Sequence, residues 1–350
     1  MTVRRINLAL QGGGAHGAFT WGVLDRLLED ETIEIAGISG TSAGALNGAA
    51  LKAGLIAGGR EGAREALNWL WSRVGAVGDM RLGAWFRAML PFQTAWTSMT
   101  ERFMPFSPAE TFSRLFSPYD YGVFYQHPLD GVARHFEFDR VCSDAGPALF
   151  VAATNVRTGR IRVFSGDEIT PEAILASACL PTIFQAIEIP DPASGQVEAY
   201  WDGGYTGNPA LFPLYAPGLP PDIVVVSINP FYRDQVPRLA QEILDRINEI
   251  SFNASLLSEL RAIRFVRRLI AEGRIEAGAM KDVLVHVIAD DRFMAELGAS
   301  SKLAPAPDLL WALRAAGRNA AGRFLEGHGE KLNREASVNL GALFDGVSPP

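Results

Sequence analysis

Short apolar runs alternate with amphipathic stretches at the start of the chain. Residues 6–10 (INLAL) and 33–39 (IEIAGIS) are apolar runs of the length that buried strands have. Residues 16–30 repeat apolar side chains on one helical face, and residues 42–55 are rich in small residues with good helix propensity. A strand, a helix, a second strand and a second helix in this order predict a βαβ unit with a parallel sheet.

The same alternation continues along the rest of the chain. The further elements that the pattern predicts are a helix at 61–74, strands at 148–154 and 160–165, a helix at 171–179, strands at 183–189, 198–201 and 223–228, a helix at 235–272, a strand at 283–288 and mostly helical chain at 300–345. No internal repeat is visible, and no Ser/Gly linker is long enough to separate domains. One α/β domain with insertions is therefore the simplest interpretation.

Composition excludes several classes of protein. The chain has 350 residues, of which 48% are apolar and 20% charged, the mixture of a globular protein with a sizeable core. Its formal charge of −7 argues against a nucleic-acid-binding protein, which normally has a basic face. The first apolar run is too short for a signal peptide, and no run is long enough for a membrane span. The only cysteines are Cys142 and Cys179, so a reducing compartment fits best and we expect a soluble, cytoplasmic protein.

Gly40-Thr41-Ser42-Ala43-Gly44 fits the pattern G-x-S-x-G between a predicted strand and a predicted helix. In this setting the pattern holds a serine on a sharp turn, where its hydroxyl can act as a nucleophile. The small residues let the strand and helix pack closely, and the helix N-terminus directs N–H groups and its positive end toward the serine. Because a glycine-rich chain also produces this pattern by chance, a plain tight turn stays the alternative.

A second glycine motif, Gly12-Gly13-Gly14-Ala15-His16-Gly17, follows the first predicted strand. Parallel strands end at the same edge of a sheet, so we expect this loop beside Ser42. Glycine N–H groups there can approach a substrate carbonyl and stabilise an oxyanion. The same residues fit the dinucleotide pattern G-x-G-x-x-G, but the second strand ends without the carboxylate that binds a ribose. The dinucleotide interpretation is therefore the weaker one.

Two residues compete as the base that takes the proton of Ser42. Asp202 ends a predicted strand and precedes Gly203 and Gly204, a sequence that is often only a turn. A carboxylate hydrogen-bonded to the serine can act as the base if burial raises its basicity. Alternatively, Ser42, Asp202 and His286 occur in the order of an α/β-hydrolase triad. However, His286 lies within the apolar run VLVHVI, where a structural role is more usual, and Ser42 follows only the second strand.

Taken together, the glycine loop at 12–17, the motif at 40–44 and Asp202-Gly203-Gly204 resemble the motifs of the patatin-like phospholipase family. Shorter stretches add to the resemblance at 153–155 (ATN) and 177–181 (SACLP). The resemblance covers about residues 5–230. It implies a three-layer α/β/α sandwich with a mostly parallel central sheet, and a Ser–Asp dyad without a catalytic histidine. It also implies a serine lipid acyl hydrolase of phospholipase A, lysophospholipase or carboxylesterase type, which needs no cofactor and no metal.

The resemblance assigns a role to each motif. Ser42 attacks an ester carbonyl, Asp202 takes the proton, and the N–H groups of Gly12, Gly13 and Gly14 hold the oxyanion. The glycines that support the motifs are Gly40, Gly44, Gly203 and Gly204. The implied partner is a lipid or phospholipid, and a peripheral contact with the inner membrane surface and a homodimer are both compatible with it. A catalytically weak lipid-binding or scaffold protein on the same fold is the alternative, which the intact serine and aspartate disfavour.

One position departs from the family's pattern, and one region extends beyond it. The family usually carries Arg or Lys in the glycine loop where this chain has His16, so we expect the charge there to depend on pH. We expect residues 5–230 to form the catalytic domain, and residues 231–350 to form a mostly helical extension packed on it without a catalytic role. The helical region at 235–272 can cover the sheet or form a dimer face.

Residues 80–126 concentrate aromatic and methionine side chains between proline and serine residues. Packing of an insertion against the core is the default interpretation. The alternative is a lid that lines the acyl chain and meets a lipid surface, since Trp and Phe favour such boundaries.

Polar substitution of Trp85 and Phe86 tests the lid hypothesis. We predict lower activity on long-chain or vesicle substrates and unchanged activity on short soluble esters, because only the former need an apolar wall. The measurement is the rate of hydrolysis on both kinds of substrate. An equal loss on both would contradict the lid.

Overall fold

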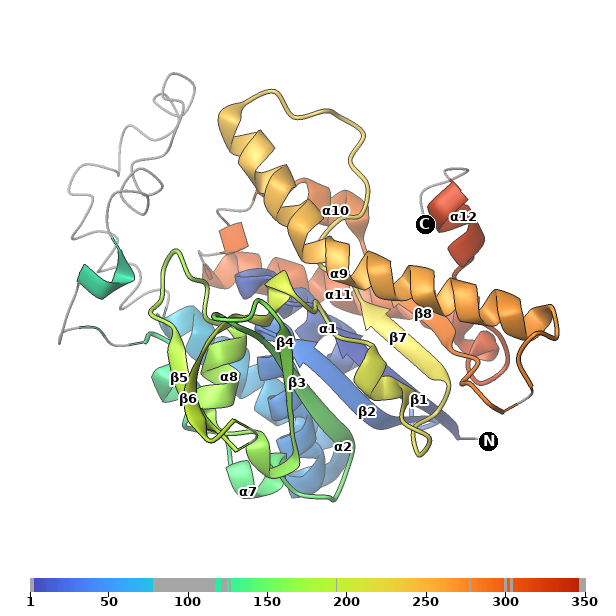
Figure 1. Cartoon of the computed structure of the whole chain (residues 1–350), viewed down its shortest axis with the longest axis horizontal. Helices are drawn as coiled ribbons and strands as arrows, with labels where there is room; N and C mark the ends of the chain where they lie inside the picture. Colours follow the sequence, from blue (N-terminus) through green and yellow to red (C-terminus); the bar gives the residue numbers. More distant parts are fainter. Residues whose placement is uncertain are drawn as a thin grey trace.

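The structure is a computed structural model that describes residues 3–77, 117–120, 125, 127–192, 194–276, 278–298, 301–302 and 305–345. Within these residues, eight strands form one sheet in the order β5-β6-β3-β2-β1-β7-β8, with β4 paired to β3 (Figure 1). The strands are β1 (Arg4–Leu10), β2 (Ile33–Thr41), β3 (Ala148–Asn155), β4 (Ile161–Ser165), β5 (Ile187–Asp191), β6 (Gln196–Asp202), β7 (Asp222–Val226) and β8 (Leu284–Ile288). The pairs among β1, β2, β3, β7 and β8 are parallel, and those that involve β4, β5 or β6 are antiparallel. The sheet is therefore mostly parallel, as predicted.

Helices cover both faces of this sheet (Figure 1). The described helices include α1 (Gly17–Leu27), α2 (Ala43–Val77), α6 (Asp130–Ala133), α7 (Phe138–Val141), α8 (Pro171–Ser177), α9 (Ala240–Ala271), α10 (Asp291–Ala295), α11 (Pro307–His328) and α12 (Leu340–Asp345). One face of the sheet packs against α1, α2, α8 and α11, and the other packs against α9 and α12. This is the three-layer α/β/α arrangement that the motifs imply.

Strand β1 contributes side chains to the hydrophobic cores on both faces of the sheet. Ile6, Leu8 and Leu10 join the core on the side of α1 and α2, whereas Ala9 joins the core on the side of α9. None of the four has exposed surface, so the strand is buried on both faces, as expected for the centre of a parallel sheet. Burial of each of the larger side chains contributes about 1.5–3 kcal/mol to folding.

Three predicted elements, one strand and two helices, differ in kind or extent from the observed ones. The strand predicted at 183–189 begins only at Ile187, because the N–H groups of Ile183 and Phe184 donate to the carbonyl of Leu180 in a turn. The second difference is that the helices predicted at 42–55 and 61–74 join in α2, which is interrupted by non-helical backbone at Gly58 and Gly59. The short helices α6, α7 and α10 were not predicted, because each is too short for a helical period to show.

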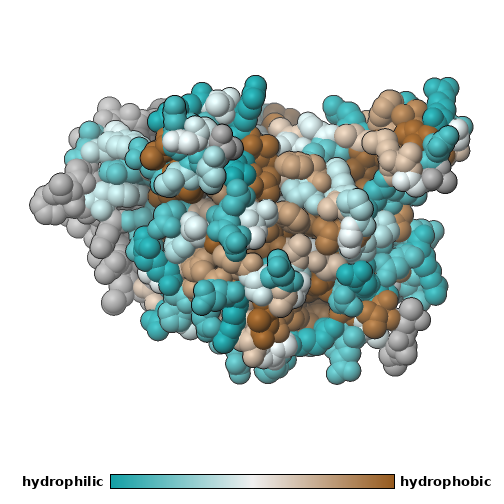
Figure 2. Space-filling view, turned by 60° about the horizontal axis from the view of Figure 1, so that its bottom comes forward, coloured by the Kyte–Doolittle hydropathy of each residue, from teal (hydrophilic) through white to brown (hydrophobic). Residues whose placement is uncertain are grey.

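Several sequence predictions concern the surface of the molecule. Among the described residues, no helix is long and apolar enough to cross a membrane. On the face drawn in Figure 2, hydrophobic and hydrophilic residues are interspersed. Most of the aromatic stretch at 80–126, including Trp85 and Phe86, lies outside the described residues, so the lid stays a prediction.

Helix α11, near the end of the chain, packs closely on α1 through two glycines. A Cβ atom built on Gly22 of α1 would lie 2.0 Å from the carbonyl oxygen of Arg314. One built on Gly317 of α11 would lie 2.0 Å from the carbonyl oxygen of Phe19. The two helix backbones are therefore in direct contact, and Asp25 of α1 adds an ion pair with Arg314 at 2.7 Å.

Substitution of Gly317 by Ala tests this contact. We predict that the methyl group forces the helices apart and lowers the free energy of unfolding by about 1–3 kcal/mol. The matched control is Gly322→Ala in the same helix, where a Cβ meets no atom within 4 Å. This control is expected to raise stability by up to about 1 kcal/mol through helix propensity. Urea unfolding measures both, and equal effects of the two substitutions would contradict the close contact.

Candidate active site

Ser42 lies on the sharp turn between β2 and α2. Its φ of 54° falls in the left-handed region that residues with a side chain rarely adopt. The turn also needs its two glycines. A Cβ on Gly40 would lie 2.5 Å from the carbonyl oxygen of Gly44, and a Cβ on Gly44 would lie 2.1 Å from that of Leu10. This close approach fixes Ser42 at the carboxyl edge of the parallel strands, as a nucleophile elbow requires.

Strand β3 brings Asp202 to Ser42. Ala152 pairs with Thr41 at the end of β2, and the next residue, Ala153, pairs with Asp202 at the end of β6. The ends of β2 and β6 therefore meet along β3. The Ser42 side chain therefore lies close enough to the Asp202 carboxyl group to lower its pKa.

The environment of Asp202 raises the pKa of its carboxyl group. The residue is only 1% exposed, and burial raises its pKa from 3.8 to about 7. A hydrogen bond from the Gly204 N–H, at 2.7 Å, and the nearby Ser42 side chain oppose this rise. The turn that follows must begin with glycine, because a Cβ on Gly203 would lie 2.2 Å from the carbonyl oxygen of Ala152.

Ser177 fixes the backbone of the elbow. The Ser42 N–H donates to Ser177 Oγ at 2.9 Å, and the Ser177 hydroxyl donates to the carbonyl oxygen of Ala152 at 2.6 Å. Ser177 is the last residue of α8, so this helix joins the elbow to β3. The SACLP stretch that adds to the family resemblance therefore begins with a residue that contacts the elbow.

The glycine loop after β1 lies against Ser42. A Cβ on Gly12 would lie 2.7 Å from Ser42 Cβ, so the two backbones are in close contact. The Gly12 N–H donates to Asn208 Oδ1 at 2.6 Å and is already engaged. In the part of the chain that the structure describes, the N–H groups of Gly13 and Gly14 have no acceptor. Of the three predicted oxyanion donors, the Gly12 N–H is therefore already hydrogen-bonded, whereas those of Gly13 and Gly14 are available within the described chain.

Buried amide side chains hold this loop in place. Gln11 Oε1 accepts hydrogen bonds from the N–H groups of Ile228 and Asn229, at 2.9 and 3.1 Å. Gln11 Nε2 donates to Asn253 Oδ1 at 3.0 Å, and Asn229 Nδ2 donates to the Gly12 carbonyl at 3.0 Å. No sequence pattern predicted that these residues hold the glycine loop. The one available signal was that Asn229 follows the end of β7, at the same sheet edge where Ser42 follows β2.

His16 stays neutral in the folded chain. It is buried, and its Nε2 lies 2.7 Å from Ser301 Oγ. Because the Ser301 hydroxyl donates to the carbonyl of Gly298, it accepts a hydrogen bond from the His16 Nε2–H. Burial and the positive charge of Lys302 lower the pKa of His16 to about 3. The expectation that the charge on His16 varies with pH near neutrality is therefore wrong.

His286 does not take part in a triad with Ser42 and Asp202. It is buried in β8, where its Nε2 lies 3.0 Å from Asp222 Oδ1 and its Nδ1 lies 3.1 Å from Ser337 Oγ. Asp222 begins β7, whereas Ser42 follows the end of β2, so the two lie at opposite ends of parallel strands. All five histidines lie within the described residues, and none of them hydrogen-bonds to the serine or the aspartate.

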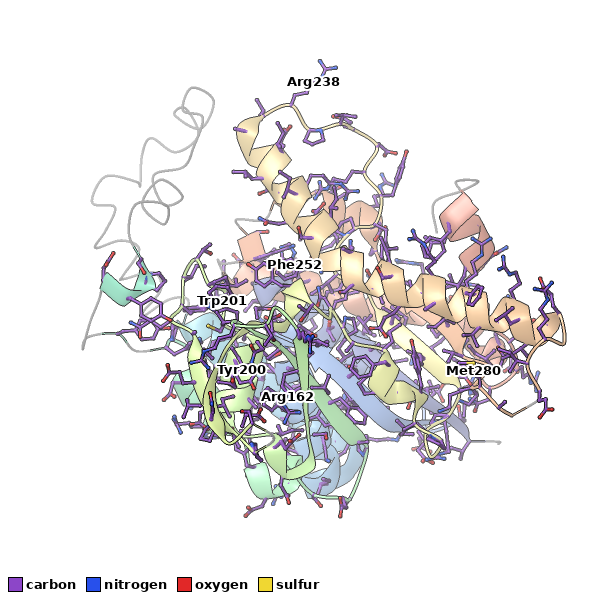
Figure 3. The ribbon with its side chains drawn as sticks, in the orientation of Figure 1. Arg162, Tyr200, Trp201, Arg238, Phe252 and Met280 are labelled. Carbon is purple, nitrogen blue, oxygen red and sulfur yellow. The ribbon has the colours of Figure 1, made fainter. Side chains whose placement is uncertain are left out.

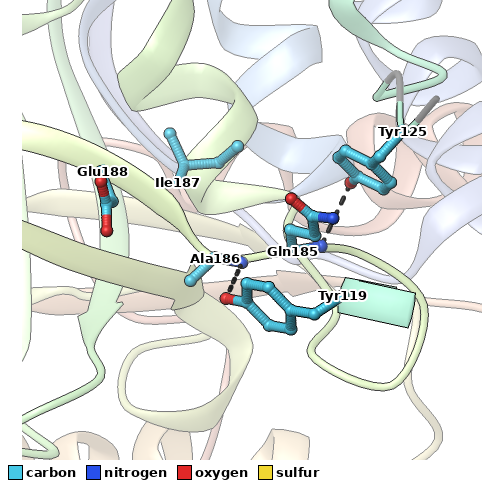
Figure 4. A pocket seen from close by; sticks show the side chains of 6 residues that line it. All are labelled: Tyr119, Tyr125, Gln185, Ala186, Ile187 and Glu188. Carbon is cyan, nitrogen blue, oxygen red and sulfur yellow. Dashed lines mark hydrogen bonds between the residues drawn. The ribbon is translucent and has the colours of Figure 1, made fainter. Parts of the chain in front are cut away.

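A pocket of about 410 Å³ lies apart from the serine and the aspartate (Figure 4). It is lined by Tyr119, Tyr125, Gln185, Ala186, Ile187 and Glu188. The hydroxyls of Tyr125 and Tyr119 accept hydrogen bonds from the N–H groups of Gln185 and Ala186, at 3.2 and 3.1 Å. These bonds hold the described part of 117–125 against the segment that leads into β5.

Among the described residues, no cluster of three or more His, Cys, Asp or Glu side chains is arranged to hold a metal ion.

Helix α9 contributes an aromatic cover to the turn after Asp202. Figure 3 shows Phe252 of α9 at the end of the sheet where β6 carries Trp201. A Cβ on Gly204 would lie 2.2 Å from Phe252 Cε1, and the Phe252 ring is 5.5 Å from that of Tyr205. The Phe252 ring therefore packs directly against the turn that follows Asp202.

The pH dependence of stability tests the state of Asp202. Its pKa is raised in the folded chain, so the folded state gains stability that is complete below about pH 3.8 and lost as the pH rises through about 7. Asp202→Asn is therefore expected to be more stable than wild type above pH 7, with a difference that shrinks toward pH 4. Thermal melting at several pH values measures this, with the exposed Asp234→Asn as control. Equal melting of the Asp202 variant and wild type at every pH would contradict the raised pKa.

Among solved structures, the chain is similar to VipD from Legionella pneumophila, with 14% identity and a TM-score of 0.42, covering 92% of this chain and 67% of that one. It is also similar to the ExoU–SpcU complex of Pseudomonas aeruginosa, with 17% identity and a TM-score of 0.34, covering 95% of this chain and 52% of that one. The chain thus spans about half the length of the second structure. No curated protein matches it.

The sequence was also compared with models of protein families. The model described as Patatin-like phospholipase matches residues 8–215, which is more than half of the chain. The matched range contains the glycine loop, the elbow with Ser42 and the turn with Asp202. The chain belongs to the patatin-like phospholipase family.

Proposed function

We propose that the protein is a serine hydrolase of lipid esters that uses Ser42 and Asp202 as a catalytic dyad. One observation carries the proposal. The serine sits on a strained elbow beside a buried carboxyl group, whose pKa burial raises to about 7. A base with this pKa is half ionised at neutral pH, which suits both the acceptance and the return of a proton. The family match supports the lipid as the class of substrate.

In the first step, Ser42 Oγ attacks the carbonyl carbon of the ester while its proton passes to Asp202. The C–O bond to the alcohol then breaks, and Asp202 returns the proton to the leaving oxygen. The product is an acyl-enzyme on Ser42 and a free alcohol or lysolipid. In the second step Asp202 takes a proton from water as the water oxygen attacks the acyl-enzyme carbonyl. The bond from the acyl carbon to Ser42 Oγ then breaks, Asp202 returns the proton to Oγ, and the fatty acid leaves.

The oxyanion of both steps needs donors that are free in the resting protein. The N–H groups of Gly13 and Gly14 meet this requirement in the described chain, and we assign them as the principal donors. Gly12 instead supports the loop, since its N–H bonds to Asn208. The N-terminus of α2, which begins directly after Ser42, adds the positive end of a helix dipole.

The proposed substrates are phospholipids, lysophospholipids or other carboxylic esters of lipids. Such substrates lie in membranes, so a peripheral contact of the protein with the inner membrane surface is part of the proposal, and a homodimer is compatible with it. The alternative function is a lipid-binding or scaffold protein with little catalysis. The adjacent pair of Ser42 and Asp202 favours the hydrolase, because binding alone requires neither a strained serine nor a buried acid.

Hydrolysis of p-nitrophenyl esters by wild type, Ser42→Ala, Asp202→Asn and His286→Ala tests the proposal. We predict that the first two variants lose activity by at least about 10³-fold, as expected when a nucleophile or its base is removed. His286→Ala should keep its kcat, although loss of the bond to Asp222 should lower its stability. If the His286 variant is inactive and the Asp202 variant is active, the dyad is contradicted and a triad that contains His286 is favoured. A wild type inert on esters and on phospholipid vesicles would favour the scaffold function.

A further inference from the structure

Ser301 and Lys302 contact the glycine loop, although they are nearly 300 residues away in the chain. Ser301 Oγ lies 2.7 Å from His16 Nε2. The carbonyl oxygen of Lys302 packs directly on Gly14, where a built Cβ would lie only 2.2 Å from it. The Lys302 ammonium donates to Asn229 Oδ1 at 2.8 Å. Two of these contacts are with the glycine loop itself, and the third is with Asn229, which hydrogen-bonds to the loop.

These contacts connect the ammonium to a proposed oxyanion donor through two amide groups. Lys302 donates to Asn229 Oδ1, and Asn229 Nδ2 donates to the Gly12 carbonyl at 3.0 Å. That carbonyl belongs to the same peptide group as the Gly13 N–H. Hydrogen bonds in such a chain polarise one another, so a cation at one end makes the N–H at the other end a stronger donor.

We propose that Lys302 is a positioning residue for ester hydrolysis, which fixes the glycine loop and polarises the Gly13 N–H through Asn229. The inference rests on the function proposed above. It supplies a cation to a loop where His16, the one titratable residue of the loop, is neutral. Lys302 does not touch the reacting atoms, and its effect passes through the amide chain.

The charged groups around Lys302 leave its ammonium available for this role. Glu249 and Asp245 of α9 raise the pKa of Lys302, and Arg233, which precedes that helix, lowers it. His16 of the glycine loop also lies close enough to interact with the Lys302 charge. Glu249 is already paired with Arg233 at 2.5 Å, and also with Arg246 of its own helix. Burial lowers the pKa of Lys302 below 10.5, and the two acidic groups oppose this shift.

Lys302→Met removes the charge and keeps the length of the side chain. We expect kcat on a short p-nitrophenyl ester to fall about 10- to 100-fold with little change in KM, because the polarised donor acts on the transition state. Lys302→Arg should restore most of the loss. The matched control is Lys281→Met, since the Lys281 ammonium is also fixed by hydrogen bonds, in its case to the backbone carbonyls of Ala216 and Leu219, but does not contact the loop. Wild-type kcat in a folded Lys302→Met protein would overturn the proposal, as would an equal loss in the control.

The pH profile separates the charge from the packing of the side chain. In wild type, kcat should fall at high pH as Lys302 loses its proton, below the ordinary lysine pKa of 10.5. In Lys302→Arg this fall should be absent, because arginine stays protonated. The same high-pH fall in both proteins would contradict the role of the ammonium, and this comparison holds even if Lys302→Met does not fold.

Hydrogen–deuterium exchange separates this inference from the proposed function. The segment 11–17 should exchange faster in Lys302→Met than in wild type or Lys281→Met, whereas β3 should exchange equally in all three. If wild type hydrolyses no ester, the proposed function fails, and the exchange of 11–17 still shows whether Lys302 holds the loop. Unchanged exchange in this segment would contradict the positioning role.

Discussion

The pairing of β3 with two strands in succession is the constraint on which the candidate site depends. Ala152 faces the end of β2, and Ala153 faces the end of β6, so residues 160 positions apart in sequence become neighbours. Neither Ser42 nor Asp202 needs a long or flexible side chain to reach the other. The rigid part of the fold sets their separation. The glycines of both turns then allow backbones to approach where a Cβ atom would collide.

The burial that suits Asp202 to its proposed role as a base also lowers the stability of the folded chain when the carboxyl group is ionised. A carboxyl group with almost no exposed surface holds its proton up to about pH 7, so its ionised form destabilises the fold in the range where a base must be ionised. The surroundings offset this cost only in part, through the Gly204 N–H and the Ser42 side chain. The strained φ of Ser42 adds to it. The large core on both sides of the sheet supplies the stability that such a site uses.

Periodicity and motifs predicted the mostly parallel sheet and the segments that carry the three motifs, because each depends on neighbouring residues. The supporting contacts could not be predicted in the same way. Asn229 and Lys302 belong to no local pattern, and only the folded chain brings them to the glycine loop. The charge of His16 failed as a prediction for a related reason, since it depends on burial and on a cation from a distant segment. Phe252 lies in the extension after residue 231 and packs against the turn after Asp202, a contact that no local sequence pattern predicts.

Covalent labelling with a fluorophosphonate tests the central claim most directly, because the reagent reacts with an activated serine and requires no knowledge of the natural lipid. The account predicts that peptide mapping finds the label on Ser42. The rate of labelling should rise as the pH passes about 7, where Asp202 ionises, and should be lost in Asp202→Asn. A label on another residue, or a rate on Ser42 that is the same with and without the Asp202 carboxyl group, would contradict it.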